Sequence, residues 1–261
     1  MTAPAPTPAP SEALIRFEGL HKRFGPKVVF DDLSLEVRKG ETLTVIGGSG
    51  AGKSVLLKCL IGLMDPDGGR ILFDGQDLSG YGEKEFLPIR RRVGFVFQAS
   101  ALFDSISVGE NIEYPLLEHF PDMPAEERAS RISRVLTLVN LPGIEGMRPS
   151  DLSGGMRRRV GLARAIATQP EVILWDEPTT GLDPISTRTI DELIRSMRAK
   201  LHCTSIVVTH DMQSAFTVSD RIALLANRHI VEVGSVVEMR TSTVKEVRAF
   251  LDARKGEARM D

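Results

Sequence analysis

The sequence lacks the features that mark disulfide-rich and membrane-spanning proteins. It has only two cysteines in 261 residues, Cys59 and Cys203, and each falls inside an apolar run. Two thiols cannot form a disulfide framework in a chain of this length, so we expect buried free cysteines in a reducing compartment. No uninterrupted apolar stretch reaches the roughly 18 residues that a membrane-spanning helix needs. A function at a membrane would therefore depend on a separate membrane-spanning partner.

The net charge and the composition of the two chain ends narrow the possible classes of protein further. The 33 basic and 35 acidic residues leave a net charge of −2, so we expect no bulk attraction to nucleic acid or to an acidic membrane surface. The N-terminus has neither the basic start nor the apolar core of a secretory signal. Residues 1–12 are rich in proline and alanine, which predicts a disordered tail. Residues 253–261 are predicted to be a charged C-terminal tail, leaving one folded domain over residues 13–252.

Apolar, β-branched runs alternate with helical patterns over much of the folded region. Helical periodicity dominates residues 108–167, and we interpret residues 99–167 as an inserted helical subdomain. Buried strands that alternate with helices are typical of a parallel sheet covered on both faces, so the predicted fold class is α/β. The main predicted strands are residues 42–46, 93–97, 172–175, 205–209 and 222–226, and the main predicted helices are residues 54–63, 185–201 and 212–218.

A glycine-rich segment between a predicted strand and a predicted helix fits the phosphate-loop pattern G-x-x-x-x-G-K-[ST]. Backbone N–H groups of such a loop can surround phosphate oxygens because glycine has no Cβ, and the helix start adds the positive end of its dipole. Lys53 would reach the terminal phosphates, and the Ser54 hydroxyl would ligate Mg²⁺. The alternative, a plain glycine-rich turn, does not explain the strand–loop–helix order. The segment consists of Gly47, Gly48, Ser49, Gly50, Ala51, Gly52, Lys53 and Ser54.

A later apolar strand ends in two adjacent acids. Residues 171–178 read EVILWDEP, so Asp176 and Glu177 close the strand. Neighbouring residues on a strand point to opposite faces. With a phosphate loop upstream, we expect Asp176 to face the Mg²⁺ and Glu177 to address the attacking water. Without that loop, the pair would be interpreted as a solvated turn.

Residues 152–156 read LSGGM and precede a helical pattern; we call them the signature segment. Ser153 is a natural helix N-cap, and Gly154 and Gly155 leave backbone N–H groups uncovered at the helix start. In isolation a plain helix cap explains the segment at least as well. Beside the phosphate loop, it predicts a dimer in which each Ser153 loop completes the phosphate site of the other copy. The arginines at 157–159 are expected to form a solvated face, and the alternative is that some of them approach phosphate or the opposite subunit.

Over residues 14–250 the chain resembles the ATP-binding subunit of an ATP-binding cassette (ABC) transporter. The LSGG sequence between the phosphate loop and the Asp-Glu strand is highly specific to that family. The resemblance implies a P-loop NTPase fold with a mostly parallel core sheet, an N-terminal antiparallel β subdomain and an inserted α-helical subdomain. It also implies ATP hydrolysis with Mg²⁺ by a homodimer of cassettes. The same resemblance implies separate transmembrane permease subunits that hold the cassettes at the cytoplasmic face of the inner membrane.

The resemblance also assigns roles to single residues outside the two phosphate-directed segments. Phe24 falls where the family stacks an aromatic ring on adenine, although tyrosine is commoner there. Gln98 matches the glutamine that contacts Mg²⁺ and the water and senses the membrane subunit. Asp183, in Gly-Leu-Asp, matches the loop that crosses the dimer interface at the nucleotide, and His210 matches the histidine that contacts the γ-phosphate. The implied catalytic residues are then Lys53, Gln98, Glu177 and His210, and the implied Mg²⁺ ligands are Ser54, Gln98 and Asp176.

Smaller matches favour one branch of the family. Met156 replaces the common glutamine after LSGG, Val55 replaces the usual threonine or serine, and residues 101–105 and 110–112 read ALFDS and ENI. Together these resemble the maintenance-of-lipid-asymmetry (Mla) phospholipid-transport ATPases. That branch implies phospholipid cargo and a lipid-binding periplasmic component. None of these residues has a chemical reason to prefer lipid, so an import system for a polar solute stays open.

Three other classes share parts of the pattern. A P-loop kinase or GTPase would have the phosphate loop but no use for the signature segment. A DNA-repair ABC ATPase would share both, but it usually carries a long coiled coil or a zinc module between them, and this chain has neither heptads nor clustered cysteines there. A tandem translation factor needs two cassettes. We therefore expect no nucleic-acid partner.

Overall fold

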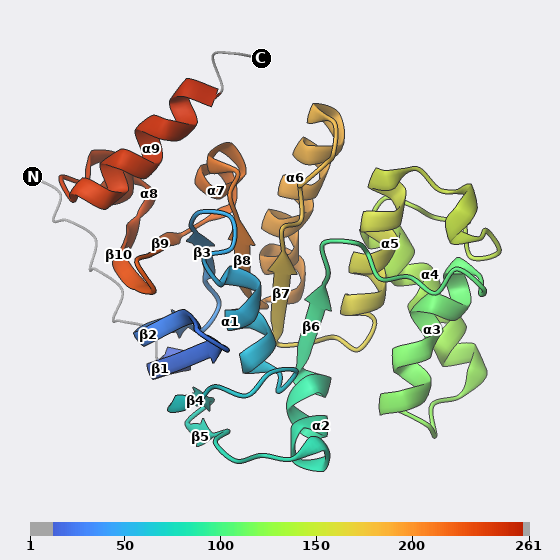
Figure 1. Ribbon diagram of the computed structural model, residues 1–261. Helices are drawn as coiled ribbons and strands as arrows, with labels where there is room; N and C mark the ends of the chain where they lie inside the picture. The colour runs from blue at the N-terminus through green and yellow to red at the C-terminus, as the bar shows by residue number, and fades with distance from the viewer. Residues whose placement is uncertain (1–12, 258–261) are drawn as a thin grey trace, which may run out of the picture.

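The structure, a computed structural model, describes residues 13–257, and Figure 1 shows its arrangement. Alternating apolar residues fold the first third of the chain into a sheet with strand order β2-β1-β4-β5, in which all neighbours are antiparallel. On β2, for example, Leu33, Leu35 and Val37 are buried and the residues between them are exposed. The strands are β1 (Ala13–Phe24), β2 (Lys27–Arg38), β4 (Gly68–Phe73) and β5 (Gln76–Asp77).

The second sheet is the core of the molecule and has the order β10-β9-β3-β8-β7-β6. Its strands are parallel except for β10, which pairs antiparallel with β9. Every residue of β3, β7 and β8 is buried, as expected of strands covered on both faces. The strands are β3 (Thr42–Ile46), β6 (Val93–Val96), β7 (Val172–Asp176), β8 (Thr204–Thr209), β9 (Arg221–Ala226) and β10 (His229–Ser235).

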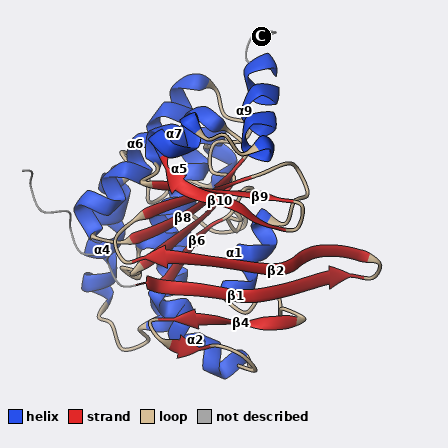
Figure 2. Cartoon of the chain, turned by 90° about the vertical axis from the view of Figure 1, so that its left-hand side faces the viewer, coloured by secondary structure: helices blue, strands red, loops and turns tan. Residues whose placement is uncertain are grey.

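Helices cover the two faces of the core sheet, and β7 shows how the faces divide. Leu174 packs into the apolar cluster that contains α1 and the antiparallel sheet, whereas Ile173 and Trp175 pack into the cluster that contains α5 and α6. Figure 2, seen from the side, shows the β1–β2 hairpin as a long ribbon beside the core strands. The helices around the core sheet are α1 (Lys53–Leu60), α2 (Glu83–Arg92), α6 (Pro184–Leu201), α7 (Met212–Val218), α8 (Val236–Thr241) and α9 (Lys245–Glu257).

A group of helices lies to one side of the core sheet, beyond β6 (Figure 1). Its apolar faces pack on one another and on the face of the sheet that Trp175 occupies. The predicted α/β class, with an antiparallel N-terminal sheet, a mostly parallel core sheet and an inserted helical region, is therefore confirmed. The elements of this helical group are α3 (Val108–His119), α4 (Ala125–Leu138), the short 3₁₀ helix η1 (Pro149–Asp151) and α5 (Gly154–Ile166).

Three helices were absent from the predicted elements. α2 carries Pro88 inside it and has charged residues at six of its ten positions, which obscures the apolar periodicity of Phe86 and Ile89. α8 and α9 follow β10, and α9 extends to Glu257, beyond residue 252, where the domain was expected to end. The predicted tail at residues 1–12 and the last residues, 258–261, lie outside the described part of the chain. Among the described residues, no helix is both long and apolar enough to span a membrane.

Candidate functional site

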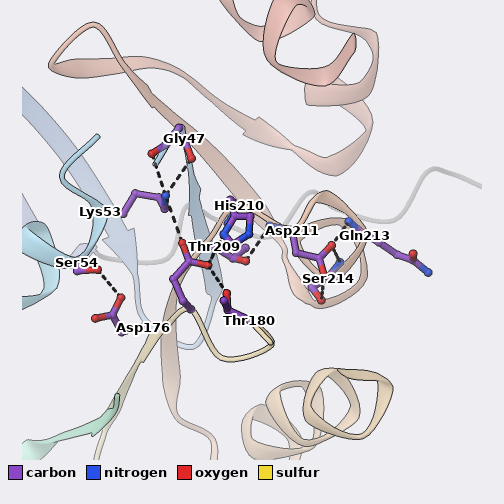
Figure 3. Close-up of polar contacts among 12 residues, drawn as sticks. Gly47, Lys53, Ser54, Asp176, Thr180, Thr209, His210, Asp211, Gln213 and Ser214 are labelled. Carbon is purple, nitrogen blue, oxygen red and sulfur yellow. Dashed lines mark hydrogen bonds and ion pairs between the residues drawn. The ribbon is translucent and has the colours of Figure 1, made fainter. Parts of the chain in front are cut away.

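The candidate site lies where three strands of the core sheet end. β8 lies between β3 and β7 and runs parallel to both, so their carboxyl ends meet at one edge. The phosphate loop follows β3, Asp176 and Glu177 close β7, and His210 follows β8. Figure 3 shows Lys53, Ser54, Asp176 and His210 around this edge. Segments far apart in the sequence therefore supply the predicted catalytic residues to one place, as is usual in open α/β sheets.

The phosphate loop needs glycine at specific positions. Gly52 has φ +105°, and a Cβ there would lie 2.5 Å from Val29 Cγ1; a Cβ on Gly47 would lie 2.4 Å from the Leu225 carbonyl oxygen. No side chain caps the start of α1 at Gly52, so its first backbone N–H groups are not engaged by a capping side chain. The loop thus presents backbone donors to the cavity described below, in the arrangement that binds phosphate.

Lys53 is buried, with 6% of its surface exposed. Its Nζ donates hydrogen bonds to the carbonyl oxygens of Gly47 and Gly48, at 3.0 and 3.2 Å, and lies 3.4 Å from Glu177 Oε1. Two of the three ammonium protons are donated to loop carbonyls, and the Glu177 carboxylate forms an ion pair with the cation. The phosphate loop therefore wraps around the Lys53 ammonium through its own carbonyl oxygens.

Glu177 is held between two cationic or potentially cationic side chains. Its Oε1 faces Lys53, while its Oε2 lies 2.8 Å from His210 Nδ1 and accepts from the His210 backbone N–H at 3.3 Å and from Thr180 Oγ1 at 3.1 Å. Its backbone has φ +48°, which is uncommon for a residue with a side chain. The hydrogen bonds and ion pairs of this buried carboxylate hold it at the sheet edge and offset the backbone strain.

Asp176 and Ser54 form the second polar pair of the site. Ser54 Oγ donates to Asp176 Oδ1 at 2.6 Å. Burial raises the pKa of Asp176 above its ordinary value, and the Ser54 hydrogen bond opposes that shift. Mg²⁺ prefers hard oxygen ligands and commonly takes one or two carboxylates together with substrate phosphates. The hydroxyl and carboxylate beside the phosphate loop are such ligands, so the residues present fit Mg²⁺.

Lys53, Ser54, Glu177 and His210 line one cavity of about 400 Å³, a size typical of small-molecule sites. Asp176 is not among the lining residues and is linked to the cavity through its hydrogen bond with Ser54. Phe24, which is 45% exposed, lies on its wall, so the predicted adenine-stacking ring is accessible to a ligand. Gln98, two residues beyond the end of β6, lines the same cavity. The remaining lining residues are Lys27, Val29, Ser49, Gly50, Ala51, Gly52 and Val55.

The signature segment and Asp183 lie outside this cavity. Ser153 caps α5, its Oγ accepting from the Met156 N–H at 3.2 Å, and Asp183 caps α6 by accepting from the backbone N–H groups of Ile185 and Ser186. A Cβ on Gly155 would lie 2.9 Å from Ser186 Oγ, so the starts of the two helices touch. The predicted nucleotide-binding residues thus form two groups that a single chain does not bring together.

One arginine near the site contradicts the sequence analysis. Arg158 was expected on a solvated face, but it is buried, with 7% of its surface exposed, and burial lowers its pKa. Its guanidinium donates to the carbonyl oxygens of Phe97, Gln98 and Thr180. It therefore ties α5 to the Gln98 loop and to the segment after Glu177. The sequence does not single out Arg158, because it stands between two other arginines. Which of the three is buried depends on which side of α5 faces the Gln98 loop.

A family model for the ABC transporter matches residues 30–180, which include the phosphate loop, the signature segment and the Asp-Glu strand. The chain belongs to the ABC transporter family. It is the ATP-binding cassette of that family, which hydrolyses ATP, so the protein is an ATPase.

Two curated relatives and one solved structure illustrate the similarity. The probable ribonucleotide transport ATP-binding protein mkl of Mycobacterium leprae is 41% identical, over 94% of this cassette and 71% of its own length. The intermembrane phospholipid transport system ATP-binding protein MlaF of Haemophilus influenzae is 39% identical, over 95% of this cassette and 92% of its own length. The cassette MJ0796, solved as a dimer in a post-hydrolysis state with ADP and Pi, superposes with a TM-score of 0.78 at 30% identity. The alignment covers 85% of this cassette and 98% of MJ0796.

Proposed function

We propose that two copies of this cassette form a head-to-tail dimer that binds ATP at two shared sites and hydrolyses it to power a separate membrane permease. The observation that carries the proposal is the separation of the two phosphate-directed groups within one chain. The cavity holds Lys53, Glu177 and His210, whereas Ser153 caps a helix outside it. A second copy would supply its own Ser153 to the open side of the cavity. The dimeric state of MJ0796 supports this arrangement.

The cavity geometry supports in-line attack of water on the γ-phosphate. A triphosphate in the loop would compete with Glu177 and the loop carbonyls for the three protons of Lys53 Nζ. Once released from Lys53, Glu177 Oε1 can accept a proton from the attacking water, while His210 keeps the other carboxylate oxygen in place. Lys53 and the loop N–H groups would stabilise charge on the transferred phosphoryl group.

Ser54, Asp176 and Gln98 would hold Mg²⁺, which when bound neutralises charge on the phosphate oxygens. Within this proposal Ser54 and Asp176 are already paired to each other and Gln98 faces the same cavity. The ligands therefore need little rearrangement to meet the ion. Phe24, exposed on the cavity wall, would stack on adenine.

We infer that the transported cargo is phospholipid moving between the inner and outer membranes. Met156, Val55 and the ALFDS and ENI segments support this branch, and MlaF aligns with the cassette over 92% of its own length. The expected partners are a transmembrane permease and a lipid-binding periplasmic component, with the cassette at the cytoplasmic face of the inner membrane. Import of a polar solute is the second candidate, because mkl, named for ribonucleotide transport, is as similar.

The dimer and the role of Glu177 are tested together by Glu177→Gln. The amide keeps the shape of the carboxylate but cannot accept the proton, so hydrolysis should fall by about 100-fold or more. ATP binding, measured by equilibrium dialysis, should persist, and light scattering with Mg²⁺ and ATP should show a closed dimer. Near wild-type phosphate release would remove Glu177 from its role, and a monomer under saturating ATP, in the presence of its membrane partners, would contradict the dimer.

The cargo is tested by purifying the full chain from its native membranes. The permease that co-purifies, and any lipid bound with it, can be identified by mass spectrometry. Deletion of the chain should raise phospholipid in the outer leaflet of the outer membrane. An unchanged lipid distribution together with a defect in polar-solute uptake would favour the second candidate.

A further inference from the structure

Two carboxylates share one hydroxyl beneath the turn that carries His210. Ser214 Oγ lies 3.1 Å from Asp191 Oδ2, on α6, and 3.1 Å from Asp211 Oδ2, at the start of α7. Ser214 and Asp191 are 3% and 6% exposed, so water does not substitute freely for either partner. A hydroxyl has one proton and can donate it to only one of the two carboxylates at a time.

The burial of Asp191 is difficult to explain by its contribution to stability alone. The other buried residues of α6 are apolar, and the Oδ1 of Asp191 has no hydrogen-bond partner within the described part of the chain, although Asp191 borders a cavity with polar walls. A buried carboxylate oxygen without a partner costs stability, so an apolar side chain would pack better there. The pKa of Asp191 is raised to about 6, mainly by burial and also by the charge of Asp211.

Asp211 connects this pair to the catalytic cavity. Its Oδ1 accepts from the backbone N–H groups of Gln213 and Ser214, and its own N–H donates to Thr209 Oγ1. His210 lies between Thr209 and Asp211 and contacts Glu177 through both its ring and its backbone. Figure 3 shows Asp211, Gln213 and Ser214 grouped at the start of α7, directly after His210. The position of the Asp211 carboxylate therefore fixes the turn on which His210 sits.

We propose that Asp191 is a positioning residue for His210, acting through a chain in which neutral Asp191 donates to Ser214 and Ser214 donates to Asp211. This inference rests on the role proposed for His210 at the γ-phosphate. When Asp191 is neutral, each hydrogen of this hydrogen-bond chain has one acceptor, and the Asp211 carboxylate stays in place as the N-cap of α7. In the ionised form two anions compete for the Ser214 proton, and the turn loses that constraint.

Charged side chains face Asp191 from α6 itself and from the turn at the start of α7. Arg188, Glu192 and Arg195 of α6 line the same cavity of about 430 Å³, and Asp211 faces it from the turn that also holds His210. The pKa of Asp191 in the folded protein lies above that of a free aspartate. The hydrogen-bond chain from Asp191 to Asp211 is therefore complete at low pH and is lost as pH rises through about 6. An asparagine at 191 would donate to Ser214 at every pH and would mimic the neutral form.

The test compares Asp191→Asn, Asp191→Leu and Ser214→Ala in the full-length ATPase, with rates expressed relative to wild type at each pH from 5 to 8. Below pH 6, where wild-type Asp191 is mostly neutral, Asp191→Leu and Ser214→Ala should lower kcat about tenfold relative to wild type with the KM for ATP unchanged, and the difference should shrink as pH rises above 6. Asp191→Asn should keep kcat, and its ratio to wild type should rise as pH passes about 6. Asp191→Leu should melt no lower than wild type, because it removes a buried carboxylate whose Oδ1 has no hydrogen-bond partner, so lost activity cannot be attributed to unfolding.

Two results would overturn the inference. One is wild-type kcat in Asp191→Leu at pH 5, and the other is an equal loss of kcat in Asp191→Asn and Asp191→Leu at that pH. His210→Ala separates this inference from the proposed function. Hydrolysis that survives in His210→Ala contradicts the proposed role of His210. Hydrolysis that is lost there but retained in Asp191→Leu removes only the positioning role of Asp191.

Discussion

The cavity at the end of the core sheet and the starts of α5 and α6 hold their polar groups in opposite ways. In the cavity, Lys53, Glu177 and His210 come from three separate segments and bond to one another. At the helix starts, Ser153 and Asp183 bond to neighbours within three residues along the chain. The cavity therefore depends on the whole sheet, whereas the helix starts depend only on local sequence.

This difference decides which surface is available to another molecule. In the cavity, Lys53 and Glu177 are buried and contact each other, so a ligand must displace existing contacts. Ser153, Gly154 and Asp183 are exposed, and Ile185 beside them is 81% exposed. Arg158 joins the two regions directly, by donating from α5 to the Gln98 and Thr180 carbonyls. The comparison predicts that mutations at the helix starts can change hydrolysis without changing the fold.

The largest effect that would sharpen this comparison is expected from Ser153→Asp. Aspartate caps helices as well as serine, so the melting temperature should be unchanged. In the proposed dimer its negative charge would face the partner's triphosphate and replace a donor, so kcat should fall by about 100-fold, the size of a lost transition-state contact. The measurements are phosphate release and thermal unfolding.

Ser235→Asp is the matched control for that change. Ser235 caps α8 with nearly the same backbone angles and a similar Oγ-to-N–H distance, 3.3 Å to Glu238 against 3.2 Å for Ser153. Its hydrolysis should equal that of wild type. If Ser153→Asp also hydrolyses ATP at the wild-type rate, Ser153 is a helix cap and nothing more.

A smaller effect is expected from Arg158→Met, which cuts the link between the two regions. Three carbonyl oxygens would lose their donor, so the free energy of unfolding should fall by about 1–3 kcal/mol. We expect kcat to fall about tenfold, because Gln98 and the segment after Glu177 are no longer held together. Urea unfolding and steady-state kinetics measure the two effects.

Arg159→Met provides the comparison for Arg158, since Arg159 donates to the carbonyls of Val139 and Asn140 instead. It should lower stability while leaving kcat near the wild-type value. Equal losses of kcat in the two variants would show that the effect comes from weakening α5 in general, and the proposed link would be abandoned.

The parts of the fold that the sequence predicted are those with local signals. The fully buried strands around Val45, Leu174 and Val208 needed only their mostly apolar runs, and the phosphate loop needed only its spacing. α2 was missed because Pro88 and its many charges mask the apolar periodicity. Local pattern therefore predicts elements well where one type of residue dominates.

The geometry of the site depends on contacts that no local pattern contains. His210 meets Glu177 because β8 lies between β3 and β7, an order set by packing of the whole sheet. Arg158 is buried and Arg157 exposed, although both stand in the same arginine run. The roles of Gln98, Ser153 and Asp183 at the nucleotide stay predictions, because a single chain holds two of them outside the cavity.

The smallest expected effect concerns the acid response of the α6 cap. Hydrogen bonds from the Ser186 hydroxyl and backbone lower the pKa of Asp183, so the ionised carboxylate stabilises the fold above the pKa of a free aspartate, about 4. That stability is lost as pH falls through the lower, folded pKa. Asparagine caps helices equally well but does not titrate in this range, so the melting temperature of Asp183→Asn should fall less than that of wild type between about pH 5 and 3.

Asp122→Asn serves as the reference for Asp183→Asn, because Asp122 is exposed and is not a helix N-cap; the N-cap of the nearby α4 is Pro124. Its acid melting curve should follow wild type. If Asp183→Asn also follows wild type, the carboxylate is not what stabilises the start of α6, and the contrast between a locally capped helix start and a mutually bonded cavity loses its clearest electrostatic support. A reduced acid response confined to Asp183→Asn would instead show that this helix start is stabilised within its own turn.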